Sequence, residues 1–345
     1  MAIDFVSVLI LLILLALFGW LTLRAWNAKR AVVKWPGCVL TGLVTLSLGL
    51  VAIFAAIGFY KLNERRTNPV ADIRVAATPA QIARGERLAN VCVTCHSWND
   101  QVVLSGSDFI AKFGFPPVGI LHSPNLTPAG NISDWSDGEL IRAIREGVHK
   151  NGRSLLIMPV ETFGNLSDDD VQAIVAYLRA QPATDRPTPT NQFNVLGALF
   201  MNLSDLRTAQ PPVGSVSTPP PGTSEYGKYM VDVLGCRGCH GTRLQGKLDL
   251  GQPGPPPGPN LTRIVPQWTE QDFMTFFNTG VLPGSGTVPT VTLAGGQTEF
   301  RMPWPGISGG HHRRRTESDV RLSPVLTGRR RTFRRMTRWP HPSSG

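Results

Sequence analysis

Two long apolar runs open the chain. Residues 5–23 contain 19 positions without a charged side chain, and residues 38–60 contain 23. Each run is close to the ~20 residues that a helix needs to cross the hydrocarbon of a bilayer. Because backbone polar groups in lipid must be paired within their own segment, two transmembrane helices are the natural interpretation. The pattern therefore predicts a helical hairpin within residues 1–66.

The flanking charges bear on the role and direction of this hairpin. A cleaved signal peptide is the alternative for the first run, but it needs a basic start and a small-residue cleavage site. Here Asp4 is the only charged residue before the run. The 14 residues between the runs contain four basic side chains and no acid: Arg24, Lys29, Arg30 and Lys34. By the positive-inside rule this loop is cytoplasmic, so we expect everything after residue 60 to lie outside the cytoplasm.

Beyond residue 66 the apolar positions recur with the spacing of short amphipathic helices. Residues 78–81 combine an N-cap threonine, a proline at the first helical position and a glutamine three residues after the cap. Ser136 and Thr269 each precede a helix with an acidic first turn. Residues 166–182 form another such helix, capped by Ser167. The predicted fold class is all-α.

Two Cys-x-x-Cys-His motifs bring candidate chemistry to these helices. One consists of Cys92, Cys95 and His96, and the other of Cys236, Cys239 and His240. Two thiols on one helical turn can add to the two vinyl groups of one haem, and the adjacent histidine then lies under the iron. A redox dithiol or half of a zinc site is the alternative for a single motif, but neither requires the histidine or the repetition. The spacing predicts two covalently bound haems c.

The similarity between the two halves extends past these motifs. Residues 124–127, Pro-Asn-Leu-Thr, recur as residues 259–262. Each of two tryptophans precedes a glycine by 12 positions: Trp135 before Gly147 and Trp268 before Gly280. These matches predict a tandem duplication. We expect one domain at residues 69–182 and a second at 223–305, joined by a Pro-rich strap at 183–222 whose apolar residues 193–203 pack across a domain.

A Met-Pro pair follows the motif histidine by 62 residues in both repeats. A methionine is usually core filler, but matched positions favour a role as the sixth iron ligand. The predicted ligand pairs are His96 with Met158 and His240 with Met302. His122 and His149 are rival ligands for the first haem. Neither has a counterpart in the second repeat, so we expect surface or core roles for both.

Composition and charge then modify this picture. Charged residues make up 17% of the chain, against roughly 25% in ordinary soluble domains. The net charge is +10, but residues 306–345 hold ten arginines and two acids, so this tail alone carries +8. A globally basic surface is excluded, and we expect no nucleic-acid partner.

The Arg-rich tail replaces a helix that the duplication predicts. The first repeat closes with LSDDDVQAIVAYL at residues 166–178, and nothing similar follows Trp304. Permitted codons for residues 311–324, read one nucleotide later, spell ITDDELKAMYAYL. We therefore predict a slip of the reading frame soon after Trp304, which leaves the second domain incomplete and residues 306–345 out of frame. A disordered basic tail is the alternative.

From about residue 78 to 305 the chain resembles a tandem class I-type cytochrome c. It is similar to the multihaem cytochrome subunits of membrane-bound alcohol, gluconate and nicotinate dehydrogenases. The resemblance lies in the two Cys-x-x-Cys-His motifs, the Asn-Leu-Thr segments, the Trp-acidic-helix segments and the two Met-Pro pairs. It implies His/Met ligation, an all-α fold and electron transfer. Those subunits commonly carry three haems, and this chain has two motifs.

The expected function is therefore electron transfer by a dihaem protein anchored in the bacterial inner membrane, with its haem domains on the periplasmic face. Electrons would come from a dehydrogenase subunit or quinol-oxidising partner and leave to a terminal oxidase or soluble cytochrome. The chain shows no catalytic constellation of acid, base or nucleophile. A dihaem peroxidase and a haem-bearing docking subunit of a respiratory complex are the alternatives.

Overall fold

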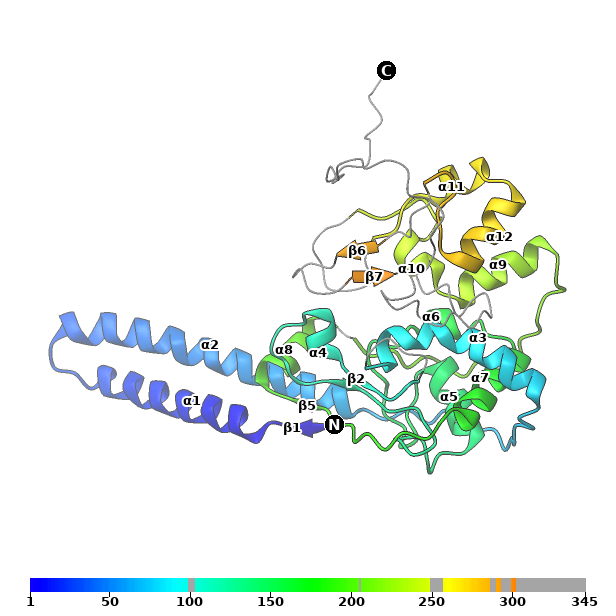
Figure 1. The fold of residues 1–345 in the computed structure, drawn as a ribbon. Coiled ribbons are helices and arrows are strands. Elements are labelled where there is room, and N and C mark those ends of the chain that lie inside the picture. Colours follow the sequence, from blue (N-terminus) through cyan, green and yellow to red (C-terminus); the bar gives the residue numbers. More distant parts are fainter. Residues whose placement is uncertain (99–102, 205, 249–256, 286–289, 293–298, 302–345) are drawn as a thin grey trace, which may run out of the picture. The chain divides into compact units, whose positions relative to one another are not determined.

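The computed structural model describes residues 1–98, 103–204, 206–248, 257–285, 290–292 and 299–301. Within these residues the chain is mostly helical, which confirms the predicted class in its coarse form (Figure 1). The departures from an all-α fold are strands of two or three residues, formed where extended segments pair. The predicted ligand Met302, the predicted slip after Trp304 and the Arg-rich tail lie outside the described residues.

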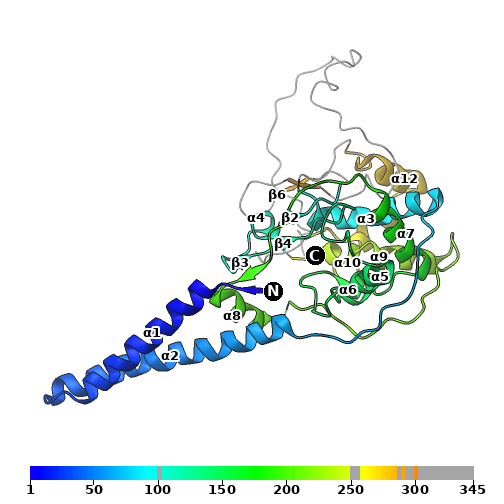
Figure 2. The ribbon, with the colours of Figure 1, turned by 90° about the horizontal axis from the view of Figure 1, so that it is seen from below.

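The two apolar runs form the long helices α1 (Phe5–Trp26) and α2 (Ala31–Asn63), which lie side by side in both views (Figures 1 and 2). By length and composition both could cross a membrane. Only 6% of each apolar window is buried, unlike the core helix of a soluble protein. The hydroxyl of Thr22 on α1 donates to the hydroxyl of Thr41 on α2, with 2.9 Å between the two oxygen atoms. Both helices extend beyond the predicted runs, because residues such as Lys34 end the apolar pattern without ending a helix.

The first repeat is organised by the crossing of α3 (Pro79–His96) and α7 (Asp168–Ala180). Thr78 caps α3 through the predicted capping box. At the crossing, a Cβ on Gly85 would lie 1.8 Å from the carbonyl oxygen of Ala173, so only glycine allows this approach. The buried side chains around the crossing form one cluster, which includes Leu88, Ala89, Leu104, Leu140, Phe163, Ile174 and Leu178.

Three shorter helices and a small sheet complete the first repeat. The helices are α4 (Phe109–Phe113), α5 (Asp137–Glu146) and α6 (Val160–Phe163), and β2 (Ser107–Asp108) pairs with antiparallel β4 (His122–Ser123). A capping box at Ser136 begins α5, and Gly147 ends it in the left-handed conformation with φ 67°. These two residues confirm the helix predicted between Trp135 and Gly147.

The strap contains one strand and one helix. Strand β5 (Gln192–Phe193) lies between parallel β1 (Ala2–Ile3) and antiparallel β3 (Gly119–Ile120). Helix α8 (Val195–Ser204) packs on α2, where a Cβ on Gly58 would lie 1.9 Å from a carbonyl oxygen of α8. The apolar part of the strap is thus packed, as predicted, and its main partner is the long helix α2.

The second repeat begins with a broken helix. Its elements are α9 (Ser224–Val233), α10 (Cys236–His240), α11 (Leu261–Ile264), the 3-10 turn η1 (Val265–Gln267), α12 (Glu270–Thr279) and antiparallel β6 (Thr290–Thr292) and β7 (Glu299–Arg301). Gly235 has φ 70°, so α9 and α10 are separate helices, whereas α3 runs unbroken through its motif. Thr269 and Gly280 delimit α12 as predicted.

Candidate functional site

A cavity of about 380 Å³ lies inside the first repeat, within the range usual for cofactor sites. Its lining includes Cys92, Cys95, His96 and Met158, the four residues predicted from the sequence to serve one haem. The rest of the lining is mainly apolar and comes from helices α3, α5, α6 and α7, from loops of the first repeat, from the strap and from Val233 of α9. The structure thus brings together residues that lie up to 66 positions apart in the sequence.

The two cysteines of this site lie on the last turns of α3. Burial raises the pKa of the Cys92 thiol to about 12 and that of Cys95 to about 11. Both thiols are therefore neutral in this pocket at physiological pH. Their spacing on one helical turn presents both sulfur atoms to the same cavity, as thioether attachment requires.

The histidine of each motif is oriented by the Pro-Asn-Leu-Thr segment of its own repeat. The Nδ1 atom of His96 lies 3.1 Å from the carbonyl oxygen of Pro124, and that of His240 lies 2.9 Å from the carbonyl oxygen of Pro259. An Nδ1–H that donates to a carbonyl leaves Nε2 to bind iron and fixes the plane of the ring. Burial also lowers the pKa of His96, which favours the neutral, ligating form. The sequence repeat revealed this segment, but its role became visible only in the structure.

Asn125, which follows Pro124, anchors the histidine-orienting segment through its buried side chain. Its side chain is fully buried and donates from Nδ2 to the carbonyl oxygens of Thr184 and Arg186, at 2.8 and 3.1 Å. Its Oδ1 accepts from the backbone N–H of Thr127 at 2.9 Å. The asparagine therefore joins the histidine-orienting segment to the start of the strap and holds the Pro124 carbonyl in place.

The backbone next to Met158 is strained. Ile157 has φ 63°, a left-handed conformation that is a genuine outlier for a β-branched residue. Its N–H donates to the carbonyl of Leu206 at 3.0 Å, which helps to hold it there. Such strain persists only where the surroundings enforce it, and it is concentrated at functional sites. No local pattern of residues indicates this conformation.

Both rival histidines line the same cavity rather than the surface. The backbone N–H of His122, on β4, donates to Oδ1 of Asn191 at 2.7 Å. His149 packs edge-on against Trp135, with the ring centres 4.7 Å apart. Burial, followed by the charge of Arg153, lowers the pKa of His149 to about 4. Sequence reasoning missed their place on the cavity because neither has a counterpart in the second repeat.

One cation on the cavity wall suits a ligand that carries carboxylates. Arg153 lines the cavity, and its backbone pairs with that of Arg65 in an isolated antiparallel β-bridge. Burial lowers the pKa of the Arg153 guanidinium. Within the described part of the chain it has no ion-pair partner. A haem carries two propionate groups, which a positive charge would favour. The cavity combines such a charge with apolar walls, two attachment thiols and two candidate ligands. These residues fit haem c.

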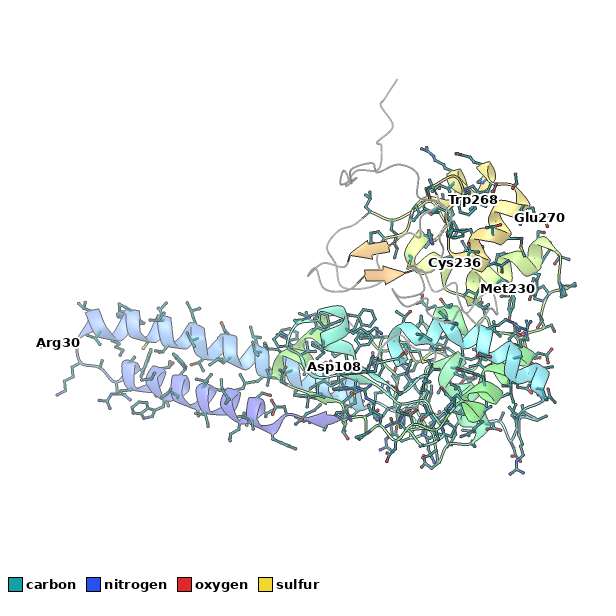
Figure 3. The ribbon with its side chains drawn as sticks, viewed as in Figure 1. Arg30, Asp108, Met230, Cys236, Trp268 and Glu270 are labelled. Carbon is teal, nitrogen blue, oxygen red and sulfur yellow. The ribbon has the colours of Figure 1, made fainter. Side chains whose placement is uncertain are left out.

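For the second motif, the structure describes the two attachment cysteines and the histidine. Cys236, Cys239 and His240 form α10, which Figure 3 marks at Cys236. Burial raises the pKa of both thiols, as it does in the first repeat. His240 is buried, at 7% exposure. The predicted partner Met302 falls outside the described residues.

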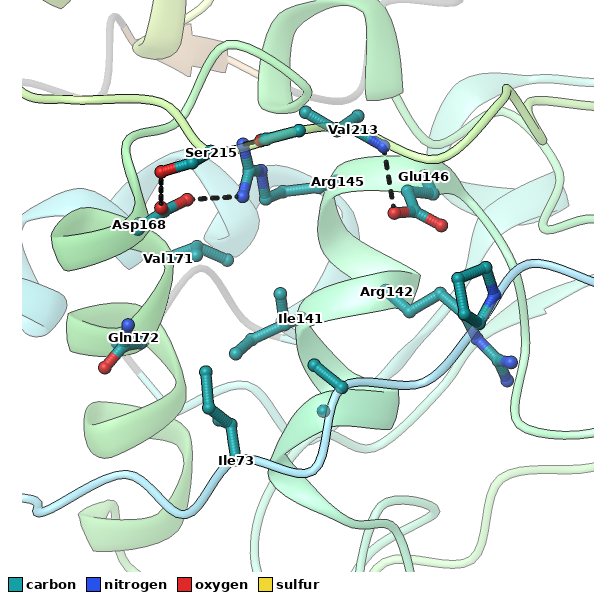
Figure 4. Close-up of a pocket in the computed structure, with 14 residues that line it drawn as sticks. Ile73, Ile141, Arg142, Arg145, Glu146, Asp168, Val171, Gln172, Val213 and Ser215 are labelled. Carbon is teal, nitrogen blue, oxygen red and sulfur yellow. Dashed lines mark hydrogen bonds and ion pairs between the residues drawn. The ribbon is translucent and has the colours of Figure 1, made fainter.

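A smaller cavity of about 270 Å³ lies between the first repeat and the chain segments on both sides of it (Figure 4). Asp168 accepts from Nη1 of Arg145 at 2.8 Å and from the hydroxyl of Ser215 at 2.5 Å. Glu146 accepts from the backbone N–H of Val213 at 3.1 Å. Because these charges are paired with one another or with the strap, they serve to fasten the strap onto the repeat.

Comparison with known proteins agrees with this chemistry. Residues 82–182 match the family model for cytochrome c. Over 223 residues the chain is 29% identical to a nicotinate dehydrogenase subunit from Pseudomonas putida, and the match covers 58% of this chain and 18% of that protein. Over 186 residues it is 33% identical to the cytochrome c subunit of gluconate 2-dehydrogenase of Pantoea cypripedii, covering 48% and 39%.

A third relative is the cytochrome c subunit of the quinone alcohol dehydrogenase of Gluconobacter oxydans. It is 32% identical over 107 residues, which cover 29% of this chain and 21% of that protein. The chain thus spans at most about two fifths of the length of these relatives. Residues 82–182 thus match the cytochrome c family, whose members bind haem c, and the chain is similar over part of its length to the cytochrome c subunits of two dehydrogenases.

Proposed function

We propose that this chain is a dihaem electron carrier, anchored in the bacterial inner membrane, with its haem domains on the periplasmic side. It would take electrons from a dehydrogenase or a quinol-oxidising partner and pass them to a terminal oxidase or a soluble cytochrome. The observation that carries this proposal is the meeting of Cys92, Cys95, His96 and Met158 at one cavity. Its relatives are named as subunits of nicotinate, gluconate and alcohol dehydrogenases, which supports a dehydrogenase partner.

Within each site, the protein's residues have distinct tasks. The cysteines would attach the cofactor, and His96 and Met158 would hold one iron while His240 and Met302 would hold the other. The apolar walls exclude water, and the carbonyl of Pro124 keeps the ring of His96 in its ligating orientation. When bound, haem c supplies reversible one-electron chemistry, and ligation by histidine and methionine raises its potential.

The anchor is supported by α1 and α2, whose apolar windows are exposed. The loop between them carries basic residues, so the positive-inside rule predicts that this loop is cytoplasmic. This orientation agrees with the attachment of haem c outside the cytoplasm. Protease digestion of spheroplasts should cleave the haem domains and leave the hairpin, and protection of the haem domains would contradict the orientation.

Two experiments test the haem sites. The covalent mass and the pyridine haemochrome spectrum should give two haems per full-length chain, and one haem would overturn the dihaem assignment. Met158→Leu should abolish the methionine–iron charge-transfer band of the first haem in the near infrared. Met201→Leu is the matched control, because Met201 is buried in α8 and does not itself line the cavity.

Purification from the native membrane in mild detergent tests the partner. A dehydrogenase subunit should co-purify with the chain, and its substrate should reduce the haems of the isolated complex. Recovery of the chain alone, together with turnover of hydrogen peroxide, would instead favour the dihaem peroxidase.

We also infer that the second repeat lacks its closing helix through a frame slip soon after Trp304. Two observations support this. Phe273 and Met274, on α12, are 38% and 50% exposed, and Gly227 on α9 has no described atom within 4 Å of the position a Cβ would take. Resequencing the DNA across codons 304–312 should reveal an inserted or missing base, and an intact frame encoding the Arg-rich tail would refute the inference.

A further inference from the structure

The first helix of the second repeat forms part of the first repeat's cavity. Val233, near the end of α9, is 2% exposed and lines the same cavity as Cys92 and Met158. Tyr229, one turn earlier, belongs to the same buried cluster as Leu88 and is 7% exposed. Without α9, this side of the cavity would therefore open to water.

A buried hydrogen-bond network fastens α9 in this position. The hydroxyl of Tyr229 donates to Oδ2 of Asp170 at 2.6 Å and accepts from the backbone N–H of Ser167 at 3.1 Å. Asp170 is fully buried and also pairs with the guanidinium of Arg84, whose Nη2 lies 2.9 Å from Oδ2. Burial, then the bond to Asp170, raises the pKa of Tyr229 to about 12, so the hydroxyl keeps its proton. This network joins α9 to α7, and removing one partner would leave a buried group unsatisfied.

The break after α9 brings the two attachment motifs together. Gly235 is left-handed, with φ 70°, and a Cβ there would lie 4.0 Å from Cγ2 of Val91 and 3.9 Å from Cγ2 of Thr162. Gly235 itself has no Cβ, so these distances show that Val91 and Thr162 lie near it. Gly235 directly precedes Cys236, and Val91 directly precedes Cys92. The two cysteines that would attach the two haems therefore follow residues that lie close together.

We propose that α9 is a positioning element: Tyr229 and Val233 hold the second attachment motif against the first cavity, so that electrons are exchanged directly between the two haems of one chain. The inference rests on the proposed function, because it requires haem at both motifs. Electron exchange weakens steeply with distance, so the proximity of Gly235 to Val91 favours exchange within one chain.

The test uses the full-length haem-loaded protein in detergent. Rapid partial reduction should be followed by redistribution of electrons between the haems at a rate independent of protein concentration. Val233→Lys places a charge in the cavity wall, should undock α9 and should slow this redistribution at least tenfold or make it concentration-dependent. Lys228→Ala is the control on the same helix, because it removes only an exposed ion pair with Asp232.

Tyr229→Phe provides a second variant that conserves shape. It removes only the hydroxyl, and we expect the amides of α9 to exchange hydrogen about ten to a hundred times faster. An unchanged, concentration-independent redistribution in Val233→Lys, or unchanged protection of α9 in Tyr229→Phe, would overturn the positioning role while leaving the dihaem function intact. A single haem per chain would overturn both.

Discussion

In the first repeat, α7 crosses α3 at Gly85. The carbonyl oxygen of Ala173 on α7 occupies the space that a side chain at Gly85 would need. In the second repeat, Gly227 occupies the matching place on α9, and no described atom lies within 4 Å of it. Gly85 precedes the buried Leu88 by three residues, as Gly227 precedes Met230. The same small residue is thus kept in both repeats, and among the described residues a helix packs against it only in the first.

The acidic-start helices differ at one of two matched core positions. Leu140 on α5 is 3% exposed, whereas Phe273 at the matching position of α12 is 38% exposed. At the other position, Ala143 and Phe276 are both buried, at 7% and 6%. Yet the histidine-to-proline hydrogen bond is preserved in both repeats. The comparison teaches that the histidine of each attachment motif is oriented locally, whereas the cavity of the first repeat is enclosed in part by side chains of α7, its last helix.

The strongest way to break this comparison is to supply the helix that the proposed frame slip would remove. A chain that continues after Trp304 in the shifted reading frame should gain stability in its second repeat. We expect on the order of 5 kcal/mol, because each buried Leu- or Ile-sized side chain contributes about 1.5–3 kcal/mol. Thermal unfolding followed through the haem of the second repeat measures the gain. Equal stability of the two chains would show that the repeats differ for another reason.

A matched pair of substitutions sharpens the comparison at the two glycines. Gly85→Ala should destabilise the first repeat by about 3 kcal/mol or more, because the added methyl group would meet the backbone of α7. Gly227→Ala should be neutral or stabilise the second repeat by up to about 1 kcal/mol, since alanine favours the helix and space is available. Chemical denaturation of both variants gives the two values. Similar losses in both would mean that α9 is covered as α3 is.

Acid should destabilise the first repeat more than the second, because of His149. Its pKa is lowered to about 4 in the folded first repeat, against an ordinary value of about 6.5. The unfolded chain therefore takes up this proton first as the pH falls. The free energy of unfolding of the first repeat should decrease by about 1–3 kcal/mol between pH 6.5 and 4.

Denaturation of each repeat across this pH range tests the expectation. His149→Gln should flatten the loss in the first repeat. The second repeat, which lacks a counterpart of His149, should not show this loss. A slope that survives His149→Gln would assign the acid sensitivity to another group.

The smallest expected effect concerns the charge on the first cavity. Arg153→Gln removes a partly buried positive charge that favours the reduced, less positive haem. The midpoint potential of the first haem should fall by a few tens of mV, equivalent to on the order of 1 kcal/mol for a one-electron couple. If the chain carries the two proposed haems, spectroelectrochemical titration should resolve them, and the potential of the second should stay unchanged. A rise in the first potential would contradict the role given to Arg153.

Features that depend on neighbouring residues alone were predictable from the sequence. The capping boxes at Thr78 and Ser136, and the left-handed end of α5 at Gly147, follow from side chains that bond within one helical turn. The attachment motifs are local for the same reason. The sequence also indicated which residues gather at the first cavity, because the duplicated Met-Pro spacing singled out Met158.

Features that depend on chain segments far apart were not predictable. Nothing local marks Val233 as part of the first cavity, since its place there results from the docking of α9. The left-handed φ of Ile157 is likewise imposed by tertiary contacts. His149 was expected at the surface or in the core, and it lines the cavity because the loop after α5 folds back over Trp135.

The strap has a consequence for how α9 binds. Thr218 donates to the hydroxyl of Ser167 at 2.6 Å, and only five residues separate Thr218 from the start of α9. Such a short tether gives α9 an effective concentration on the order of millimolar or higher at its binding surface. A contact too weak to hold two separate molecules together can therefore stay closed here. The strap turns the association of the two repeats into a folding step of one chain.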